Sequence, residues 1–227
     1  MSPERSSHLD AVILLSETLD LRDISTSAHS QTVARYAATI AEELGLDAER
    51  KERVRLAGMV HDLGKIGVPD HVLLKPGSLT AGEWQQMQRH PEIGAQILDS
   101  ASLHDLASWV LAHHERPDGT GYPLRLSGDA VSLEARILAV ADAYEAMTSD
   151  RPYRAAMPAQ AAREELLRHR GTQLTGPLSM RCCVRSSWPT ISRSSRRRRS
   201  RRLVRRETEL PIAARDTTKS TQGFGAR

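Results

Sequence analysis

The chain has 227 residues and a formal net charge of +4, and aromatic residues make up only 4% of it. This length suits one domain with an appendage, and an apolar content dominated by leucine, alanine, valine and isoleucine favours an all-α core. The charge is unevenly distributed, because residues 174–227 contain 14 Lys and Arg against 3 Asp and Glu. That segment therefore carries +11 and the rest of the chain −7, which predicts two electrostatically opposite parts.

Cysteine and hydrophobicity patterns bear on the compartment. The only cysteines are the adjacent Cys182 and Cys183, which exclude a disulfide framework and a CxxC metal site and favour a reducing compartment. The apolar run from Val12 to Leu15 is too short for a signal peptide, and no stretch approaches the roughly 20 apolar residues of a membrane helix. We therefore expect a soluble cytoplasmic protein with no membrane span.

Helical patterns begin at the N-terminus. An apolar cluster predicts a helix within residues 1–20, and apolar residues spaced at i, i+3, i+4 and i+7 predict an amphipathic helix over 29–44. Gly45 is a plausible helix stop. Asp47 can cap a third helix, which the sequence predicts to end near Gly64.

The middle of the chain alternates loops with helices. Residues 65–80 are punctuated by Pro and Gly and are predicted to form a loop. Thr80 and Glu83 have the spacing of a capping box, and the helix that they begin is expected to stop near Pro91. No run has strand periodicity, and the remaining predicted elements are helices over 92–100, 103–115, 133–149 and 157–170 and a Gly/Pro-rich loop over 116–132.

The C-terminal part changes character after Gln173. Residues 174–227 lack a sustained apolar period and are rich in Arg and Ser, which predicts a disordered tail. The abrupt change resembles an out-of-frame translation or a fused tail. The arginine cluster at 196–206 could bind polyanions electrostatically, but it has no interleaved aromatic residues, so we expect no specific nucleic-acid partner.

Seven histidine and aspartate residues lie on or at the ends of predicted helices. Helix-borne imidazoles and carboxylates that point into a bundle are a common way to hold two metal ions. This ligand type suits Fe, Mn, Zn or Ni, and a carboxylate such as Asp62 can bridge two ions. The seven residues are His29, His61, Asp62, His90, His113, His114 and Asp142.

Each of these residues also has an ordinary structural explanation. His29 could be a core or capping histidine, and His90 could simply end a helix. The pair at 113–114 could belong to a solvated surface run, and Asp142 could be a packed, hydrogen-bonded carboxylate. Lys65 could interact only with a helix dipole. Taken singly, the explanations for the histidines and Asp142 are preferred, whereas the joint pattern favours a metal site. The helix-dipole explanation of Lys65 is the less favoured one beside the histidine–aspartate pair.

Three segments carry a family resemblance. The stretches HDLGKIGVPD at 61–70, HHERPDGTGYP at 113–123 and ADAYEAMTSDRPYR at 141–154 resemble the HD-GYP family of metal-dependent phosphohydrolases. The resemblance implies an HD-type helical bundle that holds two or three metal ions, often iron. It also implies hydrolysis of cyclic di-GMP to pGpG and then to GMP. The implied organisation is an N-terminal helix at 1–20, a C-terminally incomplete HD-GYP domain at 21–173 and the tail at 174–227.

The resemblance also implies residue roles. The seven histidines and aspartates match the family's metal ligands, and the catalytic residues are Asp62, which bridges the ions, and Lys65, which faces the substrate phosphate. The expected metal is iron, with manganese as the alternative. A glutamate that holds a third ion in some members is replaced by Ser25, so we expect two ions. The substrate-binding residues are Lys65, Gly121, Tyr122, Arg151 and Arg154.

Other functional readings remain open at this point. A non-catalytic cyclic di-GMP receptor or signalling module is the main alternative, because the family's closing helices are missing after residue 173. A phosphohydrolase for another nucleotide is less compatible with the intact GYP sequence. The expected partners are cyclic di-GMP, signalling proteins such as diguanylate cyclases, and a second copy of the chain paired through the N-terminal apolar helix.

Overall fold

The computed structural model describes residues 3–22, 29–150 and 154–169, which all belong to one structural unit, Met1–Trp188. Within these ranges the fold is all-α, as predicted, and the only β-type pairing is an isolated bridge between Asp118 and Ser127. The predicted tail at 174–227 lies outside the described residues. The elements are α1 (Pro3–Arg22), α2 (His29–Glu43), α3 (Ala48–Val60), η1 (Leu63–Gly67), α4 (Asp70–Leu73), α5 (Ala81–Met87), α6 (His90–Ser100), α7 (His104–Leu111), η2 (Gly128–Ala130), α8 (Leu133–Thr148) and α9 (Ala159–Arg168).

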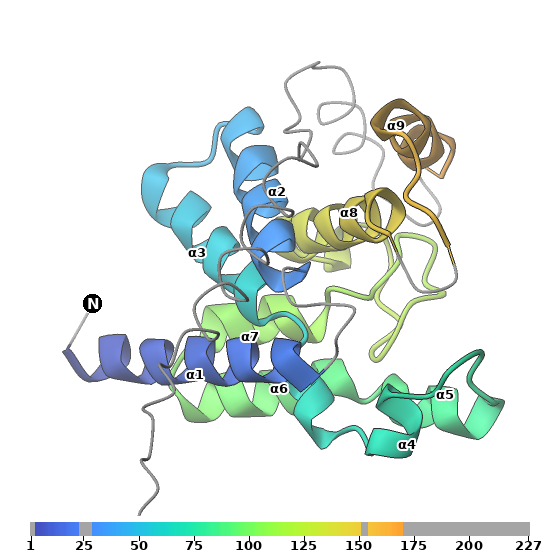
Figure 1. Cartoon of the computed structure of the whole chain (residues 1–227). Helices are drawn as coiled ribbons and strands as arrows, with labels where there is room; N and C mark the ends of the chain where they lie inside the picture. Colours follow the sequence, from blue (N-terminus) through green and yellow to red (C-terminus); the bar gives the residue numbers. More distant parts are fainter. Residues whose placement is uncertain (1–2, 23–28, 151–153, 170–227) are drawn as a thin grey trace, which may run out of the picture. The chain divides into compact units, whose positions relative to one another are not determined.

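Helices α2, α3 and α8 form the centre of the hydrophobic core (Figure 1). The apolar face of α2 is buried as its periodicity predicts, and Tyr36 meets Tyr144 of α8 edge to face at a centroid distance of 5.0 Å. Helices α2 and α3 approach closely because Gly58 has no side chain: a Cβ there would lie 2.8 Å from Cα of Ala34. The two helix ends that carry His29 and His61 are thereby brought to the same region.

Other elements pack around this core. Helix α6 contacts both α7 and η1, while α1 lies against α3 and η1, and α9 packs on α8 (Figure 1). The contact between η1 and α6 depends on Gly64, since a Cβ at this position would lie 1.8 Å from the carbonyl oxygen of His90. Gly94 faces Gly64 across the contact. The segment that follows the His61–Asp62 pair is thus held against the start of α6.

The predicted helix ends are confirmed in part. Asp47 accepts a hydrogen bond from the backbone N–H of Arg50 at 2.8 Å, and Thr80 and Glu83 form the expected capping box. Gly45 follows α2 with a φ of +77°, a conformation that favours glycine. Helix α3 ends at Val60, earlier than predicted, which leaves the next two residues in a turn.

Two predictions about the segment from 65 to 91 were wrong. Residues 65–80 are not one continuous loop, because η1 extends to Gly67 and α4 spans Asp70–Leu73. The next helix ends at Met87, and Pro91 begins a helix instead of stopping one, since it lies in the first turn of α6. A proline is tolerated there because the first N–H groups of a helix have no intrahelical partner.

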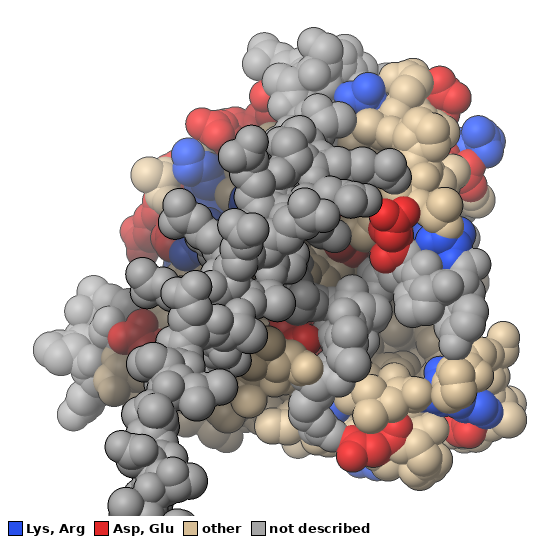
Figure 2. Space-filling view, viewed as in Figure 1, with Lys and Arg blue, Asp and Glu red and all other residues tan. Residues whose placement is uncertain are grey.

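On the face shown in Figure 2, acidic and basic side chains of the described residues are interspersed. In the described part of the chain, no helix has both the length and the hydrophobicity that a bilayer crossing requires.

Candidate metal centre

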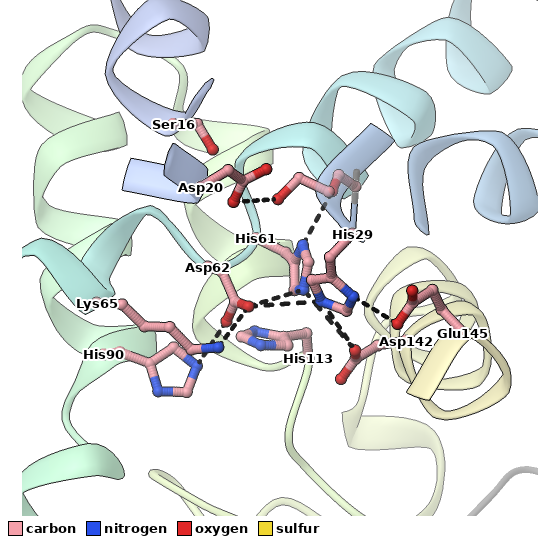
Figure 3. A network of polar contacts seen from close by, with 12 residues as sticks. Ser16, Asp20, His29, His61, Asp62, Lys65, His90, His113, Asp142 and Glu145 are labelled. Carbon is pink, nitrogen blue, oxygen red and sulfur yellow. Dashed lines mark hydrogen bonds and ion pairs between the residues drawn. The ribbon is translucent and has the colours of Figure 1, made fainter. Parts of the chain in front are cut away.

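The seven predicted ligand residues converge, and they do so through the ends of four helices and the middle of a fifth. His29 is the first residue of α2, and His90 is the first residue of α6. The His61–Asp62 pair lies in the turn after α3, His113 and His114 lie in the turn after α7, and Asp142 lies within α8. Figure 3 shows six of the seven, all but His114, with their side chains gathered around a common region. Helix packing alone therefore assembles a cluster from residues up to 113 positions apart.

The cluster divides into two groups of metal-capable side chains. The first group contains His29, His61 and Asp142, and the second group contains His90, His113 and His114. In each group the donor atoms lie within 4.8 Å of one another. Asp62 lies between the groups. Its Oδ2 is 3.4 Å from Nε2 of His61, and its Oδ1 is 3.5 Å from Nε2 of His90. A carboxylate with one oxygen toward each group is the arrangement that a bridging ligand requires.

Backbone carbonyls orient three of the imidazoles. The Nδ1 atoms of His61, His90 and His113 lie 2.9, 2.8 and 2.5 Å from the carbonyl oxygens of the residues three positions earlier. These contacts require N–H at Nδ1 and leave a lone pair on Nε2. The three Nε2 atoms are buried and have no hydrogen-bond partner among the described residues. Buried nitrogens are rarely left unpaired, so this donor set fits divalent cations of the imidazole-binding type.

Carboxylates dominate the electrostatics of the first group. Burial opposes the ionised form of Asp62, but Lys65, whose Nζ lies 2.6 Å from Oδ2, and the neighbouring histidines outweigh it and hold the pKa of Asp62 well below its usual range. Burial also disfavours a charged His29, yet the carboxylates of Asp62 and Glu145 raise the pKa of His29 to about 10. A region that retains a proton so strongly is one where a cation is stabilised.

The second group has the opposite character. Burial lowers the pKa of His113 well below its ordinary value and lowers the pKa of His114 to about 3, and the neighbouring histidines add to both shifts. Burial is also the main reason that the pKa of His90 is lowered. These three rings are therefore neutral at physiological pH, the form in which imidazole binds metal.

Two buried glutamates that support the cluster were not identified from the sequence. The Oε2 atom of Glu145 lies 2.6 Å from Nδ1 of His29, and Glu115 accepts hydrogen bonds from the backbone N–H groups of Leu124 and Leu126 at 2.6 and 2.9 Å. The only sequence signal for Glu145 is its spacing, because it follows Asp142 by three residues and so shares its face of α8. Glu115 gives no signal, since its partners lie in an irregular loop.

The GYP segment lies beside the second group. A Cβ added at Gly121 would lie 2.6 Å or less from backbone atoms of residues 114–116, so only glycine fits there. The ring of Tyr122 packs on His114 at a centroid distance of 4.8 Å, and the Tyr122–Pro123 peptide bond is cis. The loop therefore borders the cluster.

The structure gives little information on the two predicted substrate-binding arginines. Arg154 is exposed and its guanidinium donates to the carbonyl oxygen of Ala146. Arg151 lies outside the described residues.

Comparison with known proteins gives the family. A profile described as HD domain matches residues 14–177, which is most of the chain. The chain belongs to the HD domain family. The resemblance inferred from the sequence is confirmed.

Several curated relatives share this HD domain. The chain is 44% identical over 160 residues to the cyclic di-GMP phosphodiesterase response regulator RpfG of Xanthomonas campestris pv. campestris, which covers 69% of this chain and 42% of the relative. It is 38% identical over 170 residues to 3'3'-cGAMP-specific phosphodiesterase 2 of Vibrio cholerae, covering 74% of this chain and 33% of the relative. The chain thus spans less than half the length of these relatives.

Solved structures share the fold. Bd1817, an HDG"Y"P protein from Bdellovibrio bacteriovorus, superposes with a TM-score of 0.60 at 18% identity, covering 80% of this chain and 64% of that protein. The PgpH HD domain of L. monocytogenes in complex with cyclic-di-AMP gives a TM-score of 0.55 at 19% identity, covering 74% and 91%. At these identities the likeness concerns the helical architecture alone.

Proposed function

We propose that the chain is a metal-dependent phosphodiesterase that hydrolyses cyclic di-GMP to pGpG. The single observation that carries this proposal is the set of three buried Nε2 atoms that have no hydrogen-bond partner among the described residues and that converge with Asp62 and Asp142. The names of relatives such as RpfG support the substrate class. Cytoplasmic location and signalling partners such as diguanylate cyclases remain part of the same proposal.

Two metal positions follow from the two groups of donors. His29, His61 and Asp142 would hold one ion, the three histidines at 90, 113 and 114 would hold the other, and Asp62 would contact both. When bound, a divalent pair supplies a water that is acidic enough to act as a nucleophile near neutral pH, together with electrostatic stabilisation of the phosphate. We propose iron as the metal and manganese as the alternative, because both accept mixed imidazole and carboxylate ligands.

The chain's own residues contribute positioning and charge. Lys65 follows the HD pair by one turn and lies on the Asp62 side of the cluster. Its side chain is 24% exposed. An ammonium group there can stabilise a negatively charged phosphate and supply a proton to the departing ribose oxygen. Tyr122 and Gly121 lie in the loop that adjoins the cluster on the His114 side.

Turnover of cyclic di-GMP tests the proposal. The chain is purified without metal, loaded with Mn²⁺ or anaerobically with Fe²⁺, and the products are separated by chromatography. We expect pGpG, and no product from a His61→Ala/Asp62→Ala double variant. A His104→Ala/Asp105→Ala variant is a matched control, because this second adjacent His–Asp pair lies at the start of α7 and outside the two metal-capable groups.

The alternatives give different results in the same experiment. Binding of cyclic di-GMP without product would favour the non-catalytic receptor. Metal counting per chain tests the stoichiometry: we expect two ions, and three tightly held ions would contradict the role assigned to the replacement by Ser25. GMP formation from pGpG is expected to be slow if the third ion serves that step.

A further inference from the structure

A groove opens beside the candidate metal centre, between the turn that joins α5 to α6 and the GYP loop. It has a volume of about 520 Å³, and the residues that the argument uses are Gln88, Arg89, Glu92, Tyr122 and Arg125. This volume is in the range of pockets for small ligands. The groove adjoins the cluster at two points, since Arg89 directly precedes His90 and the Tyr122 ring packs on His114.

Three charged side chains of this groove are available to a ligand. Arg89, Glu92 and Arg125 are exposed, and none of them forms a hydrogen bond or ion pair through its side chain with the described residues. Arg89 and Glu92 are three positions apart at the start of α6, so they lie on the same helix face. Arg125 reaches the groove from a backbone with a φ of +55°, which is uncommon for a residue with a side chain.

This combination of charges matches one purine better than the other. Guanine presents two acceptors, O6 and N7, which a guanidinium can contact in a bidentate manner, and its N1–H and N2–H₂ donors suit a carboxylate. Adenine presents an N6 amino group where guanine has O6, so a guanidinium would keep only the contact to N7 and would face a donor at the second position. The ring of Tyr122 offers an apolar wall on which a base can stack.

We propose that this groove binds one guanine base of the cyclic dinucleotide, with Arg89 contacting O6 and N7 and Glu92 accepting from N1–H and N2–H₂. The proposal rests on the proposed function, because it places the phosphate at the metal centre and the base in the adjoining groove. The curated relatives are named for cyclic di-GMP and for 3'3'-cGAMP, and a structural neighbour is in complex with cyclic-di-AMP. These three ligands contain two, one and no guanines, so the groove provides a physical basis for choosing among them.

Substrate discrimination tests the assignment. The metal-loaded protein and its Arg89→Ala and Glu92→Gln variants are assayed for kcat/KM with cyclic di-GMP, 3'3'-cGAMP and cyclic di-AMP. We expect each variant to lose about 10- to 100-fold for cyclic di-GMP, the effect of one lost base contact, and to change by less than about threefold for cyclic di-AMP. Arg35→Ala on α2 and Glu17→Gln on α1 are matched controls, since both side chains are exposed on other elements.

The outcomes separate this inference from the proposed function. Equal losses for all three dinucleotides, or no loss for any, would overturn the guanine assignment while leaving the phosphodiesterase activity in place. If the wild-type protein hydrolyses none of them, the proposed function fails, and equilibrium binding then decides the inference. In that case tighter binding of cyclic di-GMP than of cyclic di-AMP, lost in Arg89→Ala, supports the groove, and equal binding refutes it.

Discussion

The Nδ1 atom of His29 lies 2.6 Å from Oε2 of Glu145, although 116 positions separate the two residues in the chain. Both side chains are almost fully buried, and the same imidazole turns its Nε2 toward Asp142 at 3.3 Å. Glu145 therefore fixes the orientation of a proposed metal ligand without facing the metal position itself. A carboxylate behind a histidine also makes the ring a stronger donor.

The first prediction concerns this contact. Replacement of Glu145 by Gln should lower metal affinity by about 10- to 100-fold, because outer carboxylates orient and polarise histidine ligands. Titration of the metal-free protein with Mn²⁺ measures the effect. Glu134→Gln is the matched control, since Glu134 is also buried on α8 but pairs with Arg50. Equal loss of affinity in both variants would show that only general stability had changed.

Metal binding should release protons. Because the carboxylates of Asp62 and Glu145 outweigh burial and raise the pKa of His29 to about 10, this ring is protonated at pH 7.5 in the metal-free protein. A cation must displace that proton, whereas the depressed pKa of His113 and His114 means that these rings have none to lose. Calorimetry in buffers of different ionisation enthalpy counts the protons.

The proton count also depends on pH and on Glu145. About one proton per chain should leave His29 at pH 7.5 to 8, because this range lies well below its pKa of about 10. The Glu145→Gln variant should release less at pH 8, since one of the carboxylates that raise the pKa is gone. Metal binding without proton release at pH 7.5 would contradict the protonated state of His29.

Lys65 should matter for turnover and not for metal retention. Lys65→Met should reduce kcat by about 10²- to 10³-fold if the ammonium group stabilises the developing charge. Metal affinity should stay the same or rise, because the substitution removes a cation that lies 2.6 Å from Asp62. Lys75→Met is the control, as Lys75 pairs with Glu83 near α5. A change in kcat smaller than threefold would remove Lys65 from the mechanism.

The contact between η1 and α6 should be intolerant of a methyl group. Gly64→Ala places a Cβ 1.8 Å from the carbonyl oxygen of His90, and the backbone must move, at a cost of about 1–3 kcal/mol or more. Gly82→Ala is the control, because no atom lies within 4 Å of its added Cβ and alanine favours the helix by up to about 1 kcal/mol. Urea unfolding of both metal-free variants should show opposite shifts of the midpoint.

Local sequence patterns were sufficient for the long helices. The periodic apolar residues of α2 predicted its buried face, and the side chains of Asp47 and Thr80 predicted where α3 and α5 begin, because these signals act within a few residues. The same reasoning failed at Pro91 and between 65 and 80. A proline is compatible with a helix start as well as a helix end, and helices as short as α4 have too few residues to display a period.

The candidate site, like the fold, was predictable from the sequence only in part. Histidine and aspartate recurred together on or at the ends of several predicted helices, so the sequence by itself named the seven proposed ligands and the type of metal that they suit. Only the tertiary structure decided that Asp62 turns one oxygen to each group, that Glu145 supports His29, and that Arg89 and Glu92 face a groove beside Tyr122. The physical reason is distance along the chain: local signals fix helices, whereas the relative placement of residues a hundred positions apart depends on how those helices pack.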